Sequence, residues 1–109
     1  MIIVLNKKAT KEQIQKASEE LETYIKVVVD VKKNIGAIGG KFHADAEKIL
    51  LREGSLQRDL WGGGLDLKSG KFDMQAIINI RPEQRNDSME ILDPVFRKRF
   101  LEISEKLLK

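Results

Sequence analysis

Hydrophobic and polar residues alternate most regularly between Tyr24 and Val31. Every second residue from Ile25 onward is aliphatic and falls on one side of an extended chain, while Lys26 and Asp30 fall on the other side together with Tyr24. This alternation predicts a β-strand over residues 24–31. Other apolar or alternating runs predict strands at residues 2–5, 37–42, 65–67, 72–80 and 89–92, with the turn 68–71 joining two of them into a hairpin.

Apolar residues recur at helical spacing in two other segments. Residues 11–22 follow a capping-box pattern that starts at Thr10, and residues 94–109 follow Asp93, a favourable N-cap, with proline at the first helical position. The apolar stripe of the second segment consists of Phe96, Phe100, Ile103 and Leu107. Both segments are therefore predicted to be amphipathic helices.

Residues 43–52 allow two interpretations. As a helix, the segment would form one apolar face from Phe42, Ala46, Ile49 and Leu50. As a strand, it would align His43, Asp45, Glu47, Ile49 and Leu51 on one face. Its alanine and glutamate content favours the helix.

The order of these elements predicts an α+β fold formed by a single domain, residues 1–109. We expect a small antiparallel or mixed sheet, with the N-terminal helix and the C-terminal amphipathic helix packed on one face of it. The glycine triplet after Trp61 indicates a backbone that bends or that another group approaches closely.

The amino-acid composition limits which classes of protein this chain can belong to. The 41% of hydrophobic residues is enough for a core, so disorder of the whole domain is not expected, although the 34% of charged residues exceeds the typical ~25%. It has no cysteine, which excludes thiolate metal sites and suits a cytoplasmic location. No apolar run approaches the ~18 residues of a membrane span, so no membrane association is expected. The net charge of +3 suits an anionic partner, nucleic acid included.

The first candidate site combines the only histidine with two carboxylates. His43, Asp45 and Glu47 are separated by alanines, and on a strand all three would share a face, as a facial metal triad requires. On a helix, His43 and Glu47 would still be neighbours. This pattern predicts a divalent metal as cofactor and, with Arg81 neutralising a phosphate, a metal-dependent hydrolase or nuclease. The alternative is that Asp45 caps a helix and His43 bonds to the backbone.

The second candidate site lies where a predicted strand ends in a polar loop. Arg81 and Arg85 carry guanidinium groups, whose forked donors suit phosphates and carboxylates. Together with Asn79, Ser88 and a stacking Trp61, they predict an anion-binding site. The alternative is a solvated turn in which Arg81 pairs with a carboxylate and Trp61 belongs to the core.

A series of short motifs extends through most of the chain. These are, in order, the segments His43–Glu47, Leu50–Leu51 with Gly54–Ser55, Leu60–Gly62, Ile78–Pro82 and Ser88–Ile91. In this order they resemble a small prokaryotic family of uncharacterised proteins, a domain of unknown function. The resemblance runs from roughly Tyr24 to the C-terminus and leaves the first strand and helix outside. It implies a small cytosolic protein and no particular activity, cofactor or catalytic residue.

Three hypotheses of function remain open on the sequence. The first is a binding module for an anionic ligand or nucleic acid, and the second is the metal-dependent hydrolase or nuclease. The third is an accessory protein that forms homodimers or larger homo-oligomers through an exposed strand edge and the amphipathic end helix. The sequence leaves open whether the protein is an enzyme.

Overall fold

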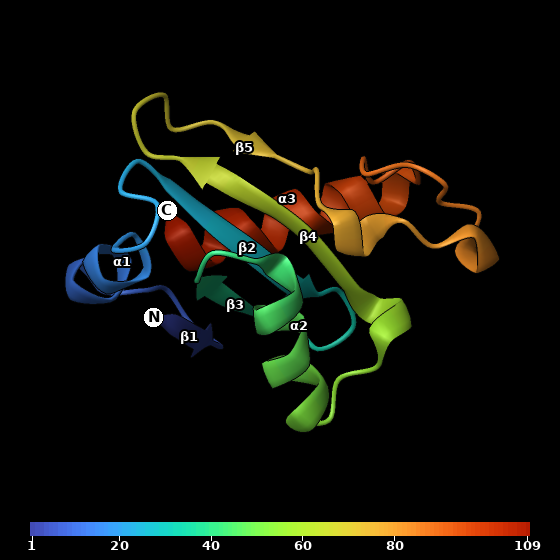
Figure 1. The fold of residues 1–109 in the computed structure, drawn as a ribbon, viewed down its shortest axis with the longest axis horizontal. Helices are drawn as coiled ribbons and strands as arrows, with labels where there is room; N and C mark the ends of the chain where they lie inside the picture. Colours follow the sequence, from blue (N-terminus) through green and yellow to red (C-terminus); the bar gives the residue numbers. More distant parts are fainter.

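Five antiparallel strands form the centre of the computed structural model, which describes residues 1–109 (Figure 1). In chain order they are β1 (Ile2–Leu5), β2 (Tyr24–Asp30), β3 (Ile35–Gly39), β4 (Leu60–Asp66) and β5 (Phe72–Asp73). Their order across the sheet is β1-β3-β2-β4-β5. All four strand pairs are antiparallel, which confirms the antiparallel alternative and the α+β class.

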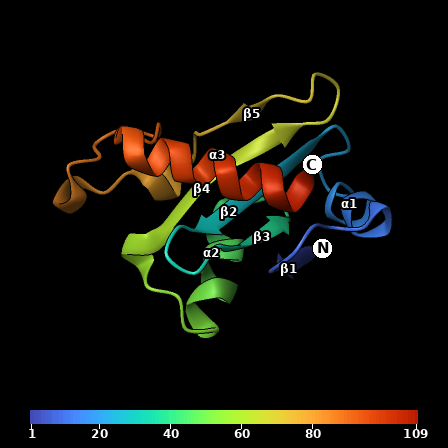
Figure 2. The ribbon, with the colours of Figure 1, turned by 180° about the vertical axis from the view of Figure 1, so that it is seen from behind.

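Helices cover both faces of this sheet. The helices are α1 (Lys11–Ala17), α2 (His43–Arg52) and α3 (Pro94–Leu108), and single 3₁₀ turns occur at Gln57–Asp59, Ile77–Asn79 and Pro82–Gln84. In Figure 1 α2 lies in front of the sheet and α3 behind it, and Figure 2 shows the reverse. Ala17 of α1 lies in the same core as the buried residues of α3, as expected for the N-terminal and C-terminal helices, whereas α2 covers the opposite face. Both sides of β2 are buried, because Val28 faces α2 while Val27 and Val29 face α3.

The larger core lies between the sheet and α3. Phe100, Ile103 and Leu107 are buried there, and the half-buried Phe96 stacks on Trp61 with the ring centroids 5.1 Å apart. The predicted helical stripe is thus confirmed. The side chain of Asp93 accepts a hydrogen bond from the amide of Val95, as its N-cap role predicts.

The smaller core lies under α2, and the helical interpretation of residues 43–52 is confirmed. Ala46 and Leu50 pack against Val28 and Leu60 of the sheet. Phe42, expected on the apolar face, is instead 65% exposed, because it is the extended N-cap residue that precedes the first helical turn.

Five predicted elements differ from the structure. The strands predicted over residues 37–42 and 65–67 occupy Ile35–Gly39 and Leu60–Asp66. The helix predicted over residues 11–22 ends at Ala17, where the Ser18 hydroxyl donates to the carbonyl of Gln15. The strand predicted over residues 72–80 ends at Asp73. Residues 89–92 form no strand, and Glu90 makes only an isolated bridge with Gln75.

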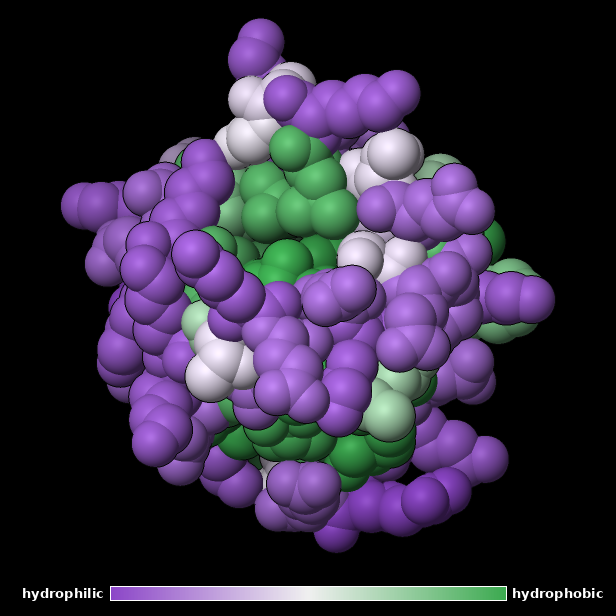
Figure 3. Space-filling view, turned by 90° about the vertical axis from the view of Figure 1, so that its left-hand side faces the viewer, coloured by the Kyte–Doolittle hydropathy of each residue, from purple (hydrophilic) through white to green (hydrophobic).

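Hydrophilic side chains cover most of the end of the molecule on the left of Figure 1, and hydrophobic ones show only in limited areas between them (Figure 3). None of the helices combines the length and the apolar composition that crossing a membrane requires.

Candidate functional site

The structure has one pocket, of about 510 Å³, on the α2 side of the sheet. Strand β2 contributes Tyr24 and Lys26, and the start of α2 contributes Phe42 and His43. The opposite wall consists of Asp73 at the end of β5, residues 75–78 of the segment that follows, and Met89. A concave site of this size, largely apolar with a few polar groups, is typical of sites for small molecules.

Glycines of β4 make room for the polar side chains of the pocket. A Cβ atom on Gly62 would lie 2.7 Å from the Cβ of Ala76 and 3.1 Å from Cδ2 of His43. A Cβ atom on Gly64 would overlap the hydroxyl group of Tyr24. The glycine triplet therefore forms regular strand without a bend, and the close approach expected there is confirmed.

Tyr24 and Asp73 form one polar pair of the pocket. The Tyr24 hydroxyl donates to Oδ2 of Asp73 at 2.7 Å, and the amide of Gln75 donates to Oδ1 at 3.1 Å. Burial, followed by the hydrogen bond to Asp73, raises the pKa of Tyr24 far above its usual range. The phenol therefore remains protonated and continues to donate at physiological pH.

His43 is the most enclosed polar group of the pocket, with 8% of its surface exposed. Its Nε2 lies 2.7 Å from the carbonyl oxygen of Gly63. Burial lowers the pKa of His43, while the hydrogen bond to Gly63 acts in the opposite direction. In the neutral ring Nε2 donates to this carbonyl, so Nδ1 has a free lone pair.

The lowered pKa of His43 predicts a specific dependence of stability on pH. The unfolded chain takes up a proton near pH 6.5, whereas folded His43 resists protonation. The contribution of His43 to the free energy of unfolding is therefore complete above about pH 7 and is lost progressively as the pH falls below the unfolded-state pKa of about 6.5 toward the lower pKa of the folded state. We expect denaturant titrations to show this loss in the wild type and not in a His43→Gln variant.

The difference between the wild type and the His43→Gln variant gives the part of the pH dependence that is due to His43. Burial raises the pKa of Glu47, which gives the opposite slope, but the same slope is present in both proteins. Identical pH dependence of wild type and variant would contradict the assignment of a neutral, buried His43.

Lys26 is the free cation of the pocket. Its side chain is half-buried, and its ammonium nitrogen lies 5.9 Å from the centroid of the Tyr24 ring. Lys26 takes part in none of the ion pairs of the structure. It pairs across the sheet with Gly64, so no neighbouring side chain on β4 covers it. Its ammonium donors are therefore available to a ligand.

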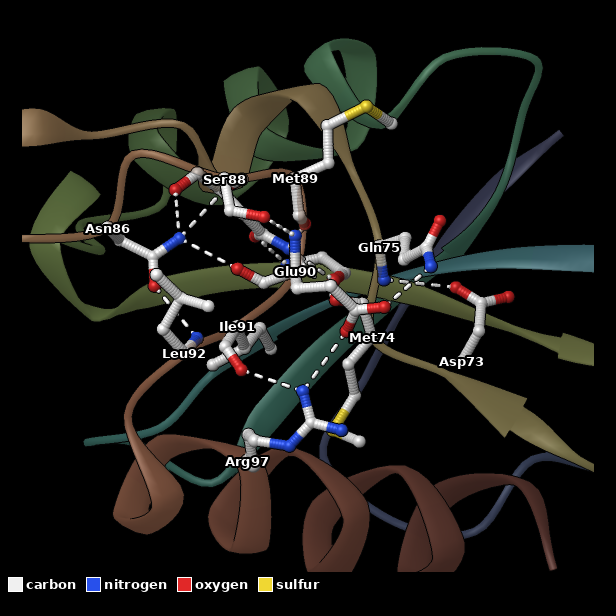
Figure 4. Close-up of polar contacts among 12 residues, drawn as sticks. Asp73, Met74, Gln75, Asn86, Ser88, Met89, Glu90, Ile91, Leu92 and Arg97 are labelled. Carbon is white, nitrogen blue, oxygen red and sulfur yellow. Dashed lines mark hydrogen bonds and ion pairs between the residues drawn. The ribbon is translucent and has the colours of Figure 1, made fainter.

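The opposite wall of the pocket, which includes Gln75 and Met89, is connected to α3 through Glu90. The Glu90 carboxylate accepts from the side chains of Gln75 and Arg97, the latter at 3.0 Å (Figure 4). The hydrogen bond from Gln75, which has the larger effect, and the one from Arg97 both lower the pKa of Glu90. The same figure shows Asn86, whose side-chain amide donates to the carbonyls of Ser88 and Glu90. This network fixes the position of the wall that includes Met89.

The three residues of the predicted metal site do not converge. Because residues 43–52 form a helix, Asp45 lies about 200° around the axis from His43 and is exposed. Nε2 of His43 bonds to Gly63, and the positive charge of Arg81 acts on Glu47. The structure contains no group of three or more histidine, aspartate or glutamate side chains that could surround a metal ion.

The residues of the predicted anion site are mostly engaged within the protein. The buried Arg81 guanidinium donates to the carbonyls of Gln57 and Leu60 and lies 4.0 Å from the Trp61 ring centroid. Trp61 and Asn79 are also buried, as the core alternative for Trp61 proposed. The remaining two residues of the set are Arg85, which is exposed, and Ser88, whose hydroxyl accepts from the amide of Glu90.

Sequence reasoning missed most of the pocket. Tyr24 and Lys26 were predicted to share a face of the strand over residues 24–31, and that polar face beside a glycine triplet was the signal that could have indicated a site. Asp73 and Gln75 gave no such signal, because they were assigned to a continuous strand. The apolar rim residues also resemble core residues in the sequence.

The match to a protein family covers nearly the whole chain. A family model described as "Protein of unknown function (DUF5674)" matches residues 3–107. The match includes β1 and α1, so it extends further toward the N-terminus than the predicted resemblance, which began near Tyr24. No curated protein and no solved structure matches the chain.

Proposed function

The chain belongs to the DUF5674 family, whose function is unknown, and we propose that it is a binding module for a small organic anion held in the pocket beside α2. The observation that supports this most directly is the free ammonium group of Lys26 inside a largely apolar pocket. The side chain of Lys26 is half-buried and has no partner in the protein, and an anionic ligand would supply a charged hydrogen-bond partner.

The N-terminal end of α2 also favours a negatively charged ligand. The first turn of a helix has amide groups without intrahelical partners and the positive end of the helix dipole. The N-cap residue of α2 is Phe42, whose side chain cannot satisfy these amides. Because Phe42, His43 and Ala44 all line the pocket, this end of the helix adds to the attraction that Lys26 exerts on an anion.

The rim of the pocket indicates that the ligand also has an apolar part. Ile77 is 73% exposed and Met89 is 43% exposed, and both line the pocket with the similarly exposed Phe42. Exposed apolar side chains gathered at one opening are typical of a binding site. An aromatic or aliphatic group lying on them would remove this surface from water.

A small molecule fits these observations better than a nucleic acid. The cation available in the pocket is a single lysine beside the carboxylate of Asp73, whereas a nucleic-acid groove presents a row of cations to successive phosphates. We therefore retain the anionic ligand of the first hypothesis and assign it to the pocket of Lys26 and His43.

Titration of the ¹⁵N-labelled protein with 3-phenylpropionate, benzoate and phenyl phosphate tests this proposal. We expect at least one of these anions to shift the amide signals of Phe42, Ala44 and Ile77. A Lys26→Met variant is expected to bind about tenfold more weakly, since a charged hydrogen bond contributes about 1.5–3 kcal/mol. Lys48→Met serves as the matched control, because Lys48 is exposed on α2 and does not line the pocket. Absence of any shift, or equal loss in both variants, would contradict the proposal.

A further inference from the structure

We propose that the ligand is a zwitterion with an apolar body, such as a free amino acid or a dipeptide, whose carboxylate is bound by Lys26 and whose ammonium group is bound by Asp73. This inference rests on the proposed function, because it assigns the anionic end of the ligand to the same lysine. It adds a second, oppositely charged recognition group in the same pocket.

Both charges are present in the pocket and they are not paired with each other. Lys26 and Asp73 line the same pocket, yet no ion pair joins them. Tyr24, which contacts the carboxylate directly, also lies near the ammonium group of Lys26. Opposite charges that border one cavity without meeting are complementary to a molecule that has both charges.

Asp73 retains the capacity to accept an ammonium group. Each carboxylate oxygen has about two acceptor positions, and each receives one hydrogen bond, from Tyr24 or from Gln75. These two bonds fix the orientation of the carboxylate and leave further positions open. The Tyr24 oxygen, which donates its proton to Asp73, can itself accept a second donor of the ammonium group.

The neutral side chain of His43 does not interfere with binding of either charged end of the ligand. His43 borders the pocket in its neutral form, with Nε2 donating to Gly63, so it places no second cation beside the ammonium position. The carboxylate of Asp73, by contrast, would repel a ligand that had only negative charge. This repulsion gives the pocket a physical means of preferring a zwitterion to a simple organic acid.

Three closely matched ligands test separately how the carboxylate and the ammonium group contribute to binding. L-phenylalanine has both, N-acetyl-L-phenylalanine has only the carboxylate, and L-phenylalaninamide has only the ammonium group. Calorimetric titration of the wild type is expected to show L-phenylalanine binding about tenfold more tightly than either analogue. L-leucyl-L-phenylalanine tests the longer zwitterion, and its binding in place of L-phenylalanine would support the dipeptide form.

Two variants assign each charge to its residue. Asp73→Asn keeps an acceptor for Tyr24, and we expect it to abolish the preference for L-phenylalanine over the N-acetyl analogue. Lys26→Met is expected to abolish the preference over the amide. A merely structural effect would weaken all ligands equally, so this crossed pattern distinguishes recognition from loss of fold.

The wild-type comparison alone decides the inference if a variant does not fold. Binding of N-acetyl-L-phenylalanine as tight as that of L-phenylalanine and its dipeptide would overturn the zwitterion while the proposed function remained. Absence of binding by the zwitterions and by all the simple anions would overturn both.

Discussion

Replacing Gly63 with alanine is expected to lower the free energy of unfolding by about 3 kcal/mol, the upper part of the range for overpacked interiors. The added Cβ atom would overlap the backbone carbonyl of Asp73 and lie 2.6 Å from Cζ of Phe100. The carbonyl belongs to β5, which is paired with β4 at this point, so it cannot move away without disrupting the sheet. Urea denaturation of wild type and variant measures the difference.

A neighbouring glycine supplies the control. In Gly64→Ala the three atoms nearest to the added Cβ all belong to the side chain of Tyr24, so a second substitution, Tyr24→Ala, removes the nearest obstacle. We expect the double variant to be more stable than the sum of the two single effects predicts. Phe100→Ala cannot rescue Gly63→Ala in this way, because the backbone obstacle remains. If Gly63→Ala were as stable as the wild type, the close approach of the Asp73 backbone to Gly63 would be contradicted.

Two of the elements that the sequence predicted correctly have a long and regular pattern. The alternation over residues 24–31 and the helical stripe of residues 94–109 each repeat over several periods, and both elements are present. The sequence could not show that α2 and α3 cover opposite faces. That arrangement depends on which small residues leave room on the second face of the sheet, such as Ala37 and Gly62.

The segment of residues 72–80 alternates as regularly as a strand, and a tertiary contact overrides it. The register of β5 on β4 would place Gln75 opposite Gly62 if the pairing continued. The side chain of Asn79 instead bonds to both the amide and the carbonyl of Gly62. A side-chain amide has therefore replaced the next peptide group of the strand, which no local pattern reveals.

The candidate sites show why charged residues are difficult to assign from sequence. Arg81 has the donor geometry for a phosphate, but the same geometry suits backbone carbonyls, and in the fold it binds two of them. Lys26 has no internal partner and lies in the pocket. The difference depends on contacts between segments far apart in the chain, and the spacing of residues does not record it.

Replacing Asn79 with alanine is expected to lower the free energy of unfolding by about 3–4 kcal/mol, because buried groups left without hydrogen bonds cost about 1–3 kcal/mol each. Asn79 is fully buried, and its side chain bonds to the amide of Gly62 at 2.8 Å and to its carbonyl at 2.9 Å. The same Nδ2 donates to the carbonyl of Met89 at 2.9 Å. Loss of the side chain therefore leaves the amide and the carbonyl of Gly62 unsatisfied, while the carbonyl of Met89 keeps only the hydrogen bond from the amide of Ala76.

Two further variants distinguish hydrogen bonding from volume. Asn79→Asp keeps the shape and the acceptor for the Gly62 amide but removes the donor and places negative charge against two carbonyls, so we expect it to be at least as destabilising as alanine. Asn6→Ala, at an exposed position, is expected to change stability by less than about 0.5 kcal/mol. Hydrogen exchange of the Gly62 amide should accelerate in both Asn79 variants relative to Asn6→Ala. Retention of wild-type stability and of slow Gly62 exchange in Asn79→Ala would mean that β5 pairs with β4 beyond Asp73, and that the wall of the pocket is not fixed by this side chain.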